Sequence, residues 1–357
     1  MSAFDLAGLR RAYAAFLGPY PDRVLLTGHS HQAWPDAAKG AMARYFDDSA
    51  RFVDDKWGEA VFPCIERVGQ RVLARLGFDG GDPIAFGKST HELVYRVLSC
   101  FPRTARVVTT TGEFHSLHRQ LHRLEEDGLD VTWVDAAPRA GLVDRLVEAI
   151  RPGVDVVAVS AVLFEDAYVL ERLGEIIARC VDAGALPLVD AYHAFNAVSP
   201  SWGPLGDRAF VVAGGYKYAA FGEGLCFLRF PRDTTLRPAY TGWFADFDAL
   251  ERPRDGARTG YGAGGARFSG ATFDASCFYR ADAVLDHWDA FGLDVAALRA
   301  ISMRQTALLC QVLAAAAPEI ELAGPRDPER RGGFVALRVP GATAVARALR
   351  GDDVWVD

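Results

Sequence analysis

The sequence predicts an α/β protein whose core is a mostly parallel β-sheet, because two patterns alternate along the chain. From residue 84 to 230, short apolar runs typical of buried strands alternate with stretches of helical apolar spacing. The strand-like runs are 106–110, 131–134, 154–160, 186–190, 210–213 and 225–230, and the helix-like stretches include 115–126, 140–151 and 170–184. In such sheets the ligand lies at the carboxyl ends of the strands, where Ser160, Asp190 and Lys217 fall.

The segments that flank this alternating region predict a second, smaller domain. Helical spacing is present at 3–17, 59–77, 274–316 and 342–349, and strand-like runs are present at 333–339 and 354–356. A chain of 357 residues exceeds the size of one hydrophobic core. We therefore expect an N-terminal arm helix (1–24), a large α/β domain (25–255), and a linker with a small C-terminal α+β domain (256–357). Because the sequence stops within an apolar run, we expect the native chain to continue or a neighbouring element to complete that sheet.

Composition and charge exclude several classes of protein. Hydrophobic residues make up 50% of the chain and charged residues 24%, which is ordinary globular composition. The net charge of −7 and the absence of a Lys/Arg block argue against a nucleic-acid partner. No apolar run approaches the roughly 20 residues of a membrane span, and no signal peptide is evident. The six scattered cysteines predict buried thiols in a reducing cytoplasm, neither disulfides nor metal ligands.

Lys217 is the most informative residue for function. The chain has only four lysines, and Lys217 alone follows an apolar, strand-like run, within the segment G-G-Y-K-Y-A-A-F-G-E-G. A desolvated lysine has a lowered pKa and can act as an amine nucleophile that forms a Schiff base. The surrounding glycines let a flat ring approach the backbone. These features indicate pyridoxal 5′-phosphate (PLP) chemistry, in which a lysine holds the cofactor aldehyde and a carboxylate pairs with the pyridine nitrogen.

Two residues that follow the strand-like run 186–190 are candidates for the pyridine ring of such a cofactor. Asp190 ends that run and could keep the ring nitrogen protonated; a cap of a turn or helix is the commoner role for a lone aspartate there. His193 lies three residues on and could reach the ring edge or its hydroxyl, although a histidine beside a tyrosine is more often a packed residue.

The remaining candidates would hold the phosphate or cover the ring, and each also has a purely structural interpretation. Ser89 and Thr90 begin a helix, which makes them either an anion site or a plain cap. Phe114 opens another helix and could stack on the ring or belong to the core. Trp243 lies in a glycine-marked loop, where its indole N–H could donate to a phosphate or its ring could cover a core.

Five motifs together resemble the kynureninase branch of the PLP-dependent class V aminotransferase superfamily. They are G-H-S-H at 28–31, D-A-Y-H at 190–193, Y-K-Y at 216–218, R-P-A-Y-T-G-W-F at 237–244 and A-R-F-S-G at 266–270. The resemblance spans about residues 25–280 and implies fold type I, with a seven-stranded sheet in the large domain. It also implies that Tyr216 and Trp243 contact the cofactor phosphate, and that Ser30 and His31 lie in the substrate loop.

The resemblance further implies a homodimer whose active site lies between subunits. The Gly/Arg-rich stretch 251–271 is the segment we expect to cross, which would bring Ser269, Gly270 and Thr272 to the partner's cofactor or substrate. Two positions depart from the family pattern. Gly270 stands where kynureninases commonly have asparagine, and the arginine for the substrate carboxylate would lie beyond Asp357.

Three functions follow from these observations. The first is hydrolytic cleavage of a Cβ–Cγ bond in a kynurenine-like amino acid, with Lys217 and Asp190 as the catalytic residues. The second is another class V reaction on an amino acid, such as transamination or β-elimination. The third is a non-catalytic fold-type-I protein that binds PLP or a partner, which an intact Lys217 and Asp190 disfavour. A cysteine desulfurase is less expected, because no cysteine lies inside a glycine-rich loop and Cys277 falls in an apolar helical run.

Overall fold

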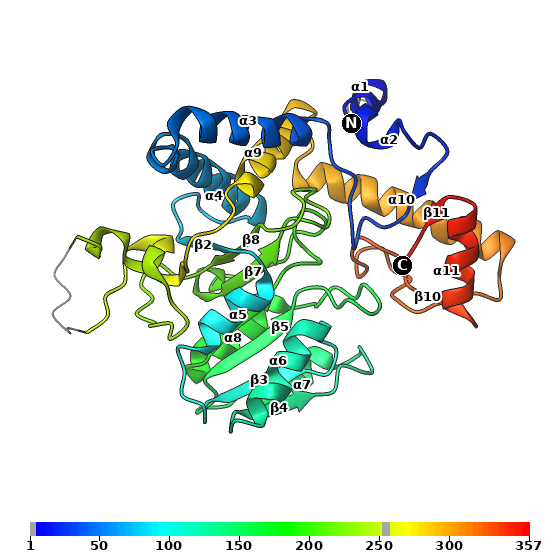
Figure 1. Cartoon of the computed structure of the whole chain (residues 1–357). Coiled ribbons are helices and arrows are strands. Elements are labelled where there is room, and N and C mark those ends of the chain that lie inside the picture. Colours follow the sequence, from blue (N-terminus) through cyan, green and yellow to red (C-terminus); the bar gives the residue numbers. More distant parts are fainter. Residues whose placement is uncertain (1–4, 252–257) are drawn as a thin grey trace.

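A computed structural model describes residues 5–251 and 258–357, and its centre is a seven-stranded sheet (Figure 1). The strands are β2 (Ile84–Gly87), β3 (Arg106–Thr110), β4 (Asp130–Val134), β5 (Val156–Ser160), β6 (Leu186–Asp190), β7 (Phe210–Gly214) and β8 (Cys226–Arg229). Their spatial order is β2-β8-β7-β6-β5-β3-β4. Pairing is parallel from β4 through β7, whereas β8 runs antiparallel to β7 and to β2. The predicted fold class is thus confirmed.

Helices cover both faces of the sheet, because alternate strand residues point to opposite sides. On one face lie α5 (Thr90–Leu98) and α6 (His115–Glu125), whose buried leucines pack on Val156 and Ala158. On the other face lie α7 (Leu142–Ala149) and α8 (Leu173–Ala183), which share a core with Val157 and Val159. A short 3₁₀-helix, η2 (Gly206–Arg208), precedes β7.

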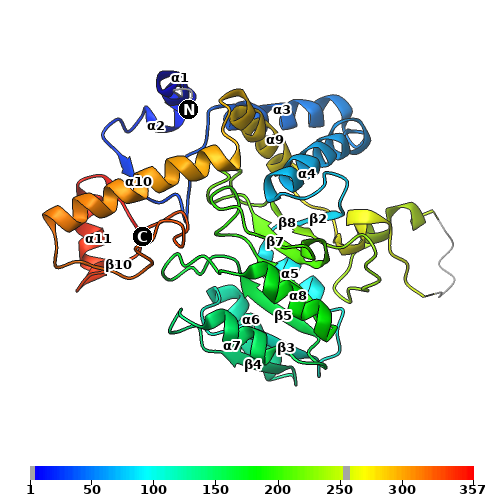
Figure 2. The same ribbon diagram turned by 180° about the vertical axis from the view of Figure 1, so that it is seen from behind.

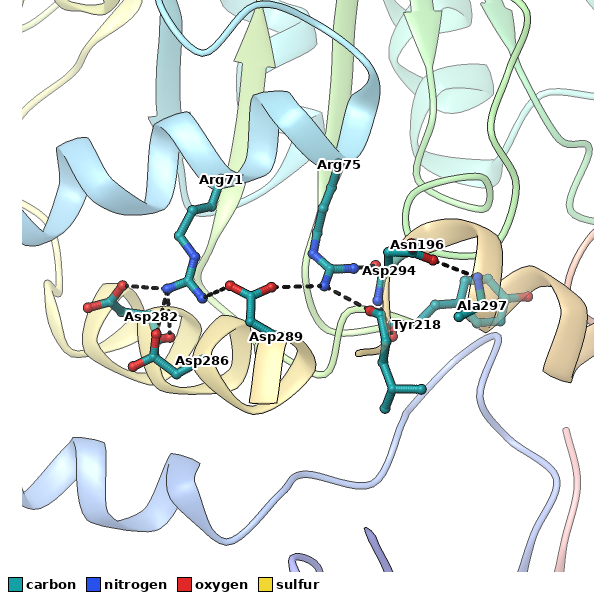
Figure 3. A network of polar contacts seen from close by, with 10 residues as sticks. Arg71, Arg75, Asn196, Tyr218, Asp282, Asp286, Asp289, Asp294 and Ala297 are labelled. Atoms are coloured by element: carbon teal, nitrogen blue, oxygen red, sulfur yellow. Dashed lines mark hydrogen bonds and ion pairs between the residues drawn. The ribbon is translucent and has the colours of Figure 1, made fainter. Parts of the chain in front are cut away.

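A second helical layer joins the N-terminal part of the chain to the segment after residue 274. It consists of α3 (Ala37–Phe52), the π-helix η1 (Trp57–Val61), α4 (Phe62–Leu76) and α9 (Ser276–Ala290). Arg71 of α4 pairs with three carboxylates of α9, at 2.8 Å from Asp286, 2.7 Å from Asp289 and 3.2 Å from Asp282 (Figure 3). The predicted helix at 59–77 is therefore present, with a π-turn at its start.

The elements near the two ends of the chain lie on one side of the sheet in both views (Figures 1 and 2). They are α1 (Leu6–Arg11), α2 (Ala14–Leu17), β1 (Val24–Leu25), α10 (Val295–Ala316), β9 (Glu321–Leu322), β10 (Leu337–Arg338), α11 (Ala342–Gly351) and β11 (Val354–Trp355). β11 pairs in parallel with β1, and β9 pairs antiparallel with β10. A neighbouring element, β1, therefore pairs with the apolar run 354–356, as one of the two alternatives expected.

Some element boundaries differ from those predicted. The helix expected at 3–17 is two short helices, and the helical span 274–316 is divided at Gly292, whose φ of +63° favours glycine. The strand expected at 333–339 has only two residues, Leu337 and Arg338, and Gly333 lies close to the Tyr218 ring, where a Cβ would come within 2.7 Å. The predicted domain boundary between 255 and 256 lies outside the described residues, and the domain limits stay a prediction. No helix in 5–251 or 258–357 has the length and apolar character needed to cross a membrane.

Candidate active site

A cavity of about 260 Å³ opens at the carboxyl ends of β5, β6 and β7, where the strand pattern predicted a ligand. It brings together eight of the residues singled out from the sequence: Ser89, Thr90, Phe114, Ser160, Asp190, His193, Tyr216 and Lys217. These residues come from segments up to 128 positions apart, and the parallel order of the strands gathers them at one edge of the sheet.

Lys217 lies on the turn after β7, and its amine is buried in the cavity wall. The turn fits only because Gly214 has no side chain: a Cβ there would come within 2.5 Å of the Tyr192 hydroxyl. Lys217 Nζ lies 2.5 Å from His193 Nε2 and 5.1 Å from the centre of the Phe114 ring. Burial lowers the pKa of Lys217 to about 8, and the nearby Asp190 carboxylate only partly opposes this. About a tenth of the amine is therefore uncharged at pH 7, far more than for an exposed lysine.

His193 is buried and neutral. Burial, and after it the charge of Lys217, lowers the pKa of His193 to about 3. Its Nε2 can therefore accept a hydrogen bond from the Lys217 amine, which places the ring proton on Nδ1. Nδ1 is buried and has no hydrogen-bond partner among the described residues. Such an unpaired buried donor is costly, so a group that accepts from Nδ1 would be bound favourably.

Asp190 ends β6, and its carboxylate faces the cavity. Its Oδ1 accepts from the backbone N–H of Tyr192 at 2.8 Å, so the residue does cap the turn that follows, as the structural interpretation predicted. Burial raises the pKa of Asp190, whereas the Tyr192 N–H and the Lys217 charge lower it. Since one oxygen closes the turn, capping and binding are compatible roles for Asp190.

The N-terminus of α5 forms another wall of the cavity. Ser89 is the N-cap, and its Oγ accepts from the Glu92 N–H at 3.2 Å. Thr90, the first residue of the helix, lines the cavity beside Ser89. The backbone N–H groups and the dipole of this helix end favour an anion. The cap is thus present, and an anion site at the same residues stays a prediction.

The residues that the resemblance assigned to the partner's site, and Trp243, do not line this cavity. Trp243 lies in the 3₁₀-helix η3 (Trp243–Ala249), is 42% exposed, and borders a separate hollow of about 180 Å³. Gly270 follows η4 (Gly264–Phe268), and its carbonyl accepts from the Phe244 N–H at 3.0 Å. Thr272 is exposed. Of the stretch 251–271, residues 252–257 lie outside the described part of the chain.

The predicted substrate loop lies at the rim of the cavity. His31 Nδ1 is 4.0 Å from the Glu223 carboxylate, which lines the cavity, and the Ser30 hydroxyl donates to Asp357. The neighbouring His29, which the sequence analysis did not single out, stacks on Phe334 at 4.8 Å. The Phe334 ring in turn lies 5.9 Å from that of His193, so this segment of the C-terminal region reaches the site.

Two groups that support the site were missed at the level of sequence. Glu113 is fully buried behind Ser160. Asn196 joins the turn after β6 to the turn of Lys217: its amide donates to the Tyr218 carbonyl at 3.2 Å, and Arg75 donates to its Oδ1 at 2.6 Å (Figure 3). Asn196 has a positive φ of +66°, a conformation that asparagine adopts more readily than most residues. The residue type at this turn was therefore the one local hint that the sequence offered.

The sequence of the chain is similar to those of kynureninases. Residues 298–357 match the family model described as the kynureninase C-terminal domain. The chain is 26% identical to a kynureninase of Pseudomonas fluorescens over an alignment of 373 residues. The alignment covers 97% of this chain and 83% of the relative.

Solved structures resemble the whole fold. The apo cysteine desulfurase of Thermococcus onnurineus NA1 aligns with a TM-score of 0.80 at 18% identity, over 100% of this chain and 88% of that one. The cysteine desulfurase CsdA of Escherichia coli aligns with a TM-score of 0.80 at 17% identity, over 99% of this chain and 88% of that one. A variant of C-DES with glycine covalently linked to its PLP cofactor aligns with a TM-score of 0.83 at 17% identity, over 96% of this chain and 91% of that one. At these identities the likeness establishes the fold and leaves the reaction open.

Proposed function

The chain belongs to the PLP-dependent class V aminotransferase superfamily, similar within it to the kynureninases, and from this premise we propose a kynureninase-like hydrolase. Its reaction would be cleavage of the Cβ–Cγ bond of an amino acid that carries a γ-carbonyl group. The observation that carries the proposal is the buried Lys217 amine, held against His193 and close enough to Asp190 to feel its charge, in a chain related to a kynureninase along nearly its whole length.

The residues of the cavity fit PLP. The Lys217 amine would hold the aldehyde, the Asp190 carboxylate would pair with the ring nitrogen, and the unpaired His193 Nδ1–H would donate to an oxygen of the ring. The phosphate would lie at the N-terminus of α5, with Ser89, Thr90 and the Tyr216 hydroxyl, and Phe114 would cover one face of the ring. Bound there, PLP supplies an electron sink for the substrate carbon that loses its proton.

The chain's own residues then have distinct tasks. Lys217, with a pKa of about 8, can be uncharged at neutral pH and take the α-proton of the substrate. His193 stays neutral and orients the amine through Nε2. Asp190 supplies a negative charge opposite the ring nitrogen. Water adds its hydroxyl to the γ-carbonyl carbon and a proton reaches Cβ, so the products are a carboxylic acid and alanine.

Transamination or β-elimination on another amino acid is the alternative, because the same three residues serve any class V reaction. Sulfur transfer is less well supported. Among the described residues that line the cavity, Cys226 is the one cysteine, and it is buried. Burial raises the pKa of its thiol to about 12, so the thiolate that would attack sulfur is scarce at neutral pH.

An amino-acid panel tests the proposed reaction. The PLP-loaded protein is incubated with kynurenine, 3-hydroxykynurenine, cysteine and common transamination donors, and the products are separated by chromatography. We expect an anthranilate-type amino acid and alanine in equal amounts. If a keto acid forms without alanine, the reaction is transamination and the proposal is wrong. If cysteine yields sulfide, the reaction is desulfuration and the proposal is wrong. A non-catalytic protein would give no product while PLP remains bound.

We also propose that the enzyme is a homodimer in which each subunit completes the partner's site. Trp243 and Gly270 belong to segments joined by the Phe244–Gly270 backbone hydrogen bond, outside the lining of this chain's own cavity, and the side chains of Tyr240, Phe247 and Leu250 nearby in the chain are exposed. Such a patch is typical of an interface. Mixing Lys217→Ala with Trp243→Ala subunits should restore part of the activity that each variant lacks. Sedimentation as a monomer that binds PLP tightly would contradict the proposal.

A further inference from the structure

A second buried carboxyl group, Glu113, lies behind the cavity wall. It is 2% exposed and sits on the turn between β3 and α6. Each of its oxygens has one hydroxyl partner: Thr110 donates to Oε1 at 2.7 Å, and Ser160 donates to Oε2 at 2.6 Å. Within residues 5–251 and 258–357 no cation pairs with it. A carboxylate buried without a cation is costly, so its presence in the core calls for a role.

Ser160 connects this carboxyl group to the site. It is the last residue of β5, lines the cavity, and lies in register with Asp190, the last residue of β6. A serine hydroxyl has a single proton, and here that proton is directed to Glu113. Ser160 therefore presents only lone pairs to the cavity, and it links Glu113, to which it donates, with Asp190, its partner in the β5–β6 register.

The two carboxyl groups are coupled by charge. Burial raises the pKa of Glu113 to about 7, although the Ser160 and Thr110 hydroxyls oppose this, and the charge of Asp190 raises it further. Asp190, from β6, is the titratable group that faces Glu113, while Thr110 of β3 and Ser160 of β5 are neutral. Two like charges in a buried site disfavour each other, so ionisation of one carboxyl group increases the proton affinity of the other.

We propose that Glu113 is a positioning residue that holds the Ser160 hydroxyl and, through its own charge, modulates the proton affinity of Asp190. While Glu113 is protonated, Asp190 remains ionised and can pair with a positively charged ring nitrogen. When Glu113 loses its proton, the second negative charge raises the proton affinity of Asp190 and changes the electrostatic environment of the ring nitrogen. This inference rests on the proposed function in one respect, that Asp190 faces the pyridine nitrogen of PLP.

Infrared difference spectroscopy of the PLP-loaded enzyme tests the proposal without a catalytic readout. A protonated buried carboxyl group gives a distinct C=O stretching band. We expect a band that disappears near pH 7 and is absent from Glu113→Gln at every pH. Thr110→Val removes a hydrogen bond to the carboxylate and should move the midpoint to higher pH. Asp190→Asn removes the repelling charge and should move it to lower pH, by at least about one pH unit if the groups interact strongly.

The visible absorbance of bound PLP gives the functional half of the test. It should change with pH across the Glu113 midpoint in the wild type and not in Glu113→Gln, whereas Glu171→Gln, a remote carboxyl group on the surface, should keep both the band and the absorbance change. A midpoint that Asp190→Asn leaves unmoved would overturn the coupling. An infrared shift without any absorbance change would overturn the role toward the cofactor. The product assay is separate, so failure of the hydrolase proposal would leave both readouts interpretable. If Glu113→Gln does not fold, Thr110→Val still identifies the band as that of Glu113 and Asp190→Asn still tests the coupling.

Discussion

Replacement of Lys217 by methionine should stabilise the cofactor-free protein while it abolishes function. The amine is 5% exposed and surrounded by the rings of Phe114, Tyr192 and Tyr216. Its pKa falls from an ordinary 10.5 to about 8. This difference of about 2.5 pH units corresponds to about 3 kcal/mol of unfolding free energy that the buried charge costs at pH 7. Methionine fills a similar volume without that cost.

The gain should depend on pH with a definite sign. The pKa of Lys217 is lower in the folded state than in the unfolded state, so the unfolded chain binds more protons between pH 8 and 10.5. Stability of the wild type therefore rises with pH through that window. The advantage of Lys217→Met should be about 3 kcal/mol at and below pH 7 and should fall below about 0.5 kcal/mol near pH 10.5.

Urea denaturation of cofactor-free wild type and variant, followed by far-UV circular dichroism at pH 7, 9 and 10.5, measures this difference. Lys39→Met is the matched control, because Lys39 is exposed on α3, and it should change stability by less than about 0.5 kcal/mol at each pH. A destabilised Lys217→Met protein, or a gain that does not vary with pH, would refute the argument that burial of the amine lowers its pKa.

Further predictions concern the groups around Lys217. Arg75→Ala should lower the free energy of unfolding by about 2–4 kcal/mol, because it removes charge-assisted bonds to Asn196 and to the Leu293 carbonyl from a side chain that is 9% exposed. The exposed Arg67→Ala should cost less than about 1 kcal/mol in the same urea titration. Asp190→Asn should keep PLP bound but lower kcat by about 100-fold or more, since a neutral amide cannot hold the ring-nitrogen proton, and a rate near that of the wild type would leave Asp190 only its capping role. His193→Ala should weaken retention of PLP on dialysis, because it removes the donor at Nδ1; unchanged retention would show that His193 serves packing alone.

Strand-end chemistry is the part of the site that could be predicted from the sequence. Asp190 and Lys217 each follow an apolar run, and the parallel sheet brings such ends together. The strand β2, by contrast, was not recognised, since I-A-F-G is short and ends in glycine, and it lies at an edge of the sheet. Its hydrogen-bonded pairing with β8, more than 130 residues away, stabilises the strand although its local sequence has little strand propensity.

The supporting groups could not be predicted, because their roles come from contacts distant in sequence. Arg75 and Asn196 are 121 positions apart, and Glu113 and Ser160 are 47 apart. Nothing in the local sequence distinguishes Glu113 from an exposed glutamate at a helix start. Trp243 shows a different limit. Its motif predicted a contact with the cofactor phosphate, but the residue lies outside the lining of this chain's cavity.

The central claim, that Lys217 is the amine that holds PLP, is tested most directly by reductive trapping. The loaded enzyme is treated with borohydride, digested and analysed by mass spectrometry. The account predicts one reduced pyridoxyl-phosphate adduct, on the peptide that contains Lys217, and loss of the yellow absorbance band. An adduct on Lys39, Lys56 or Lys88, or an unchanged yield of adduct from Lys217→Ala, would contradict it.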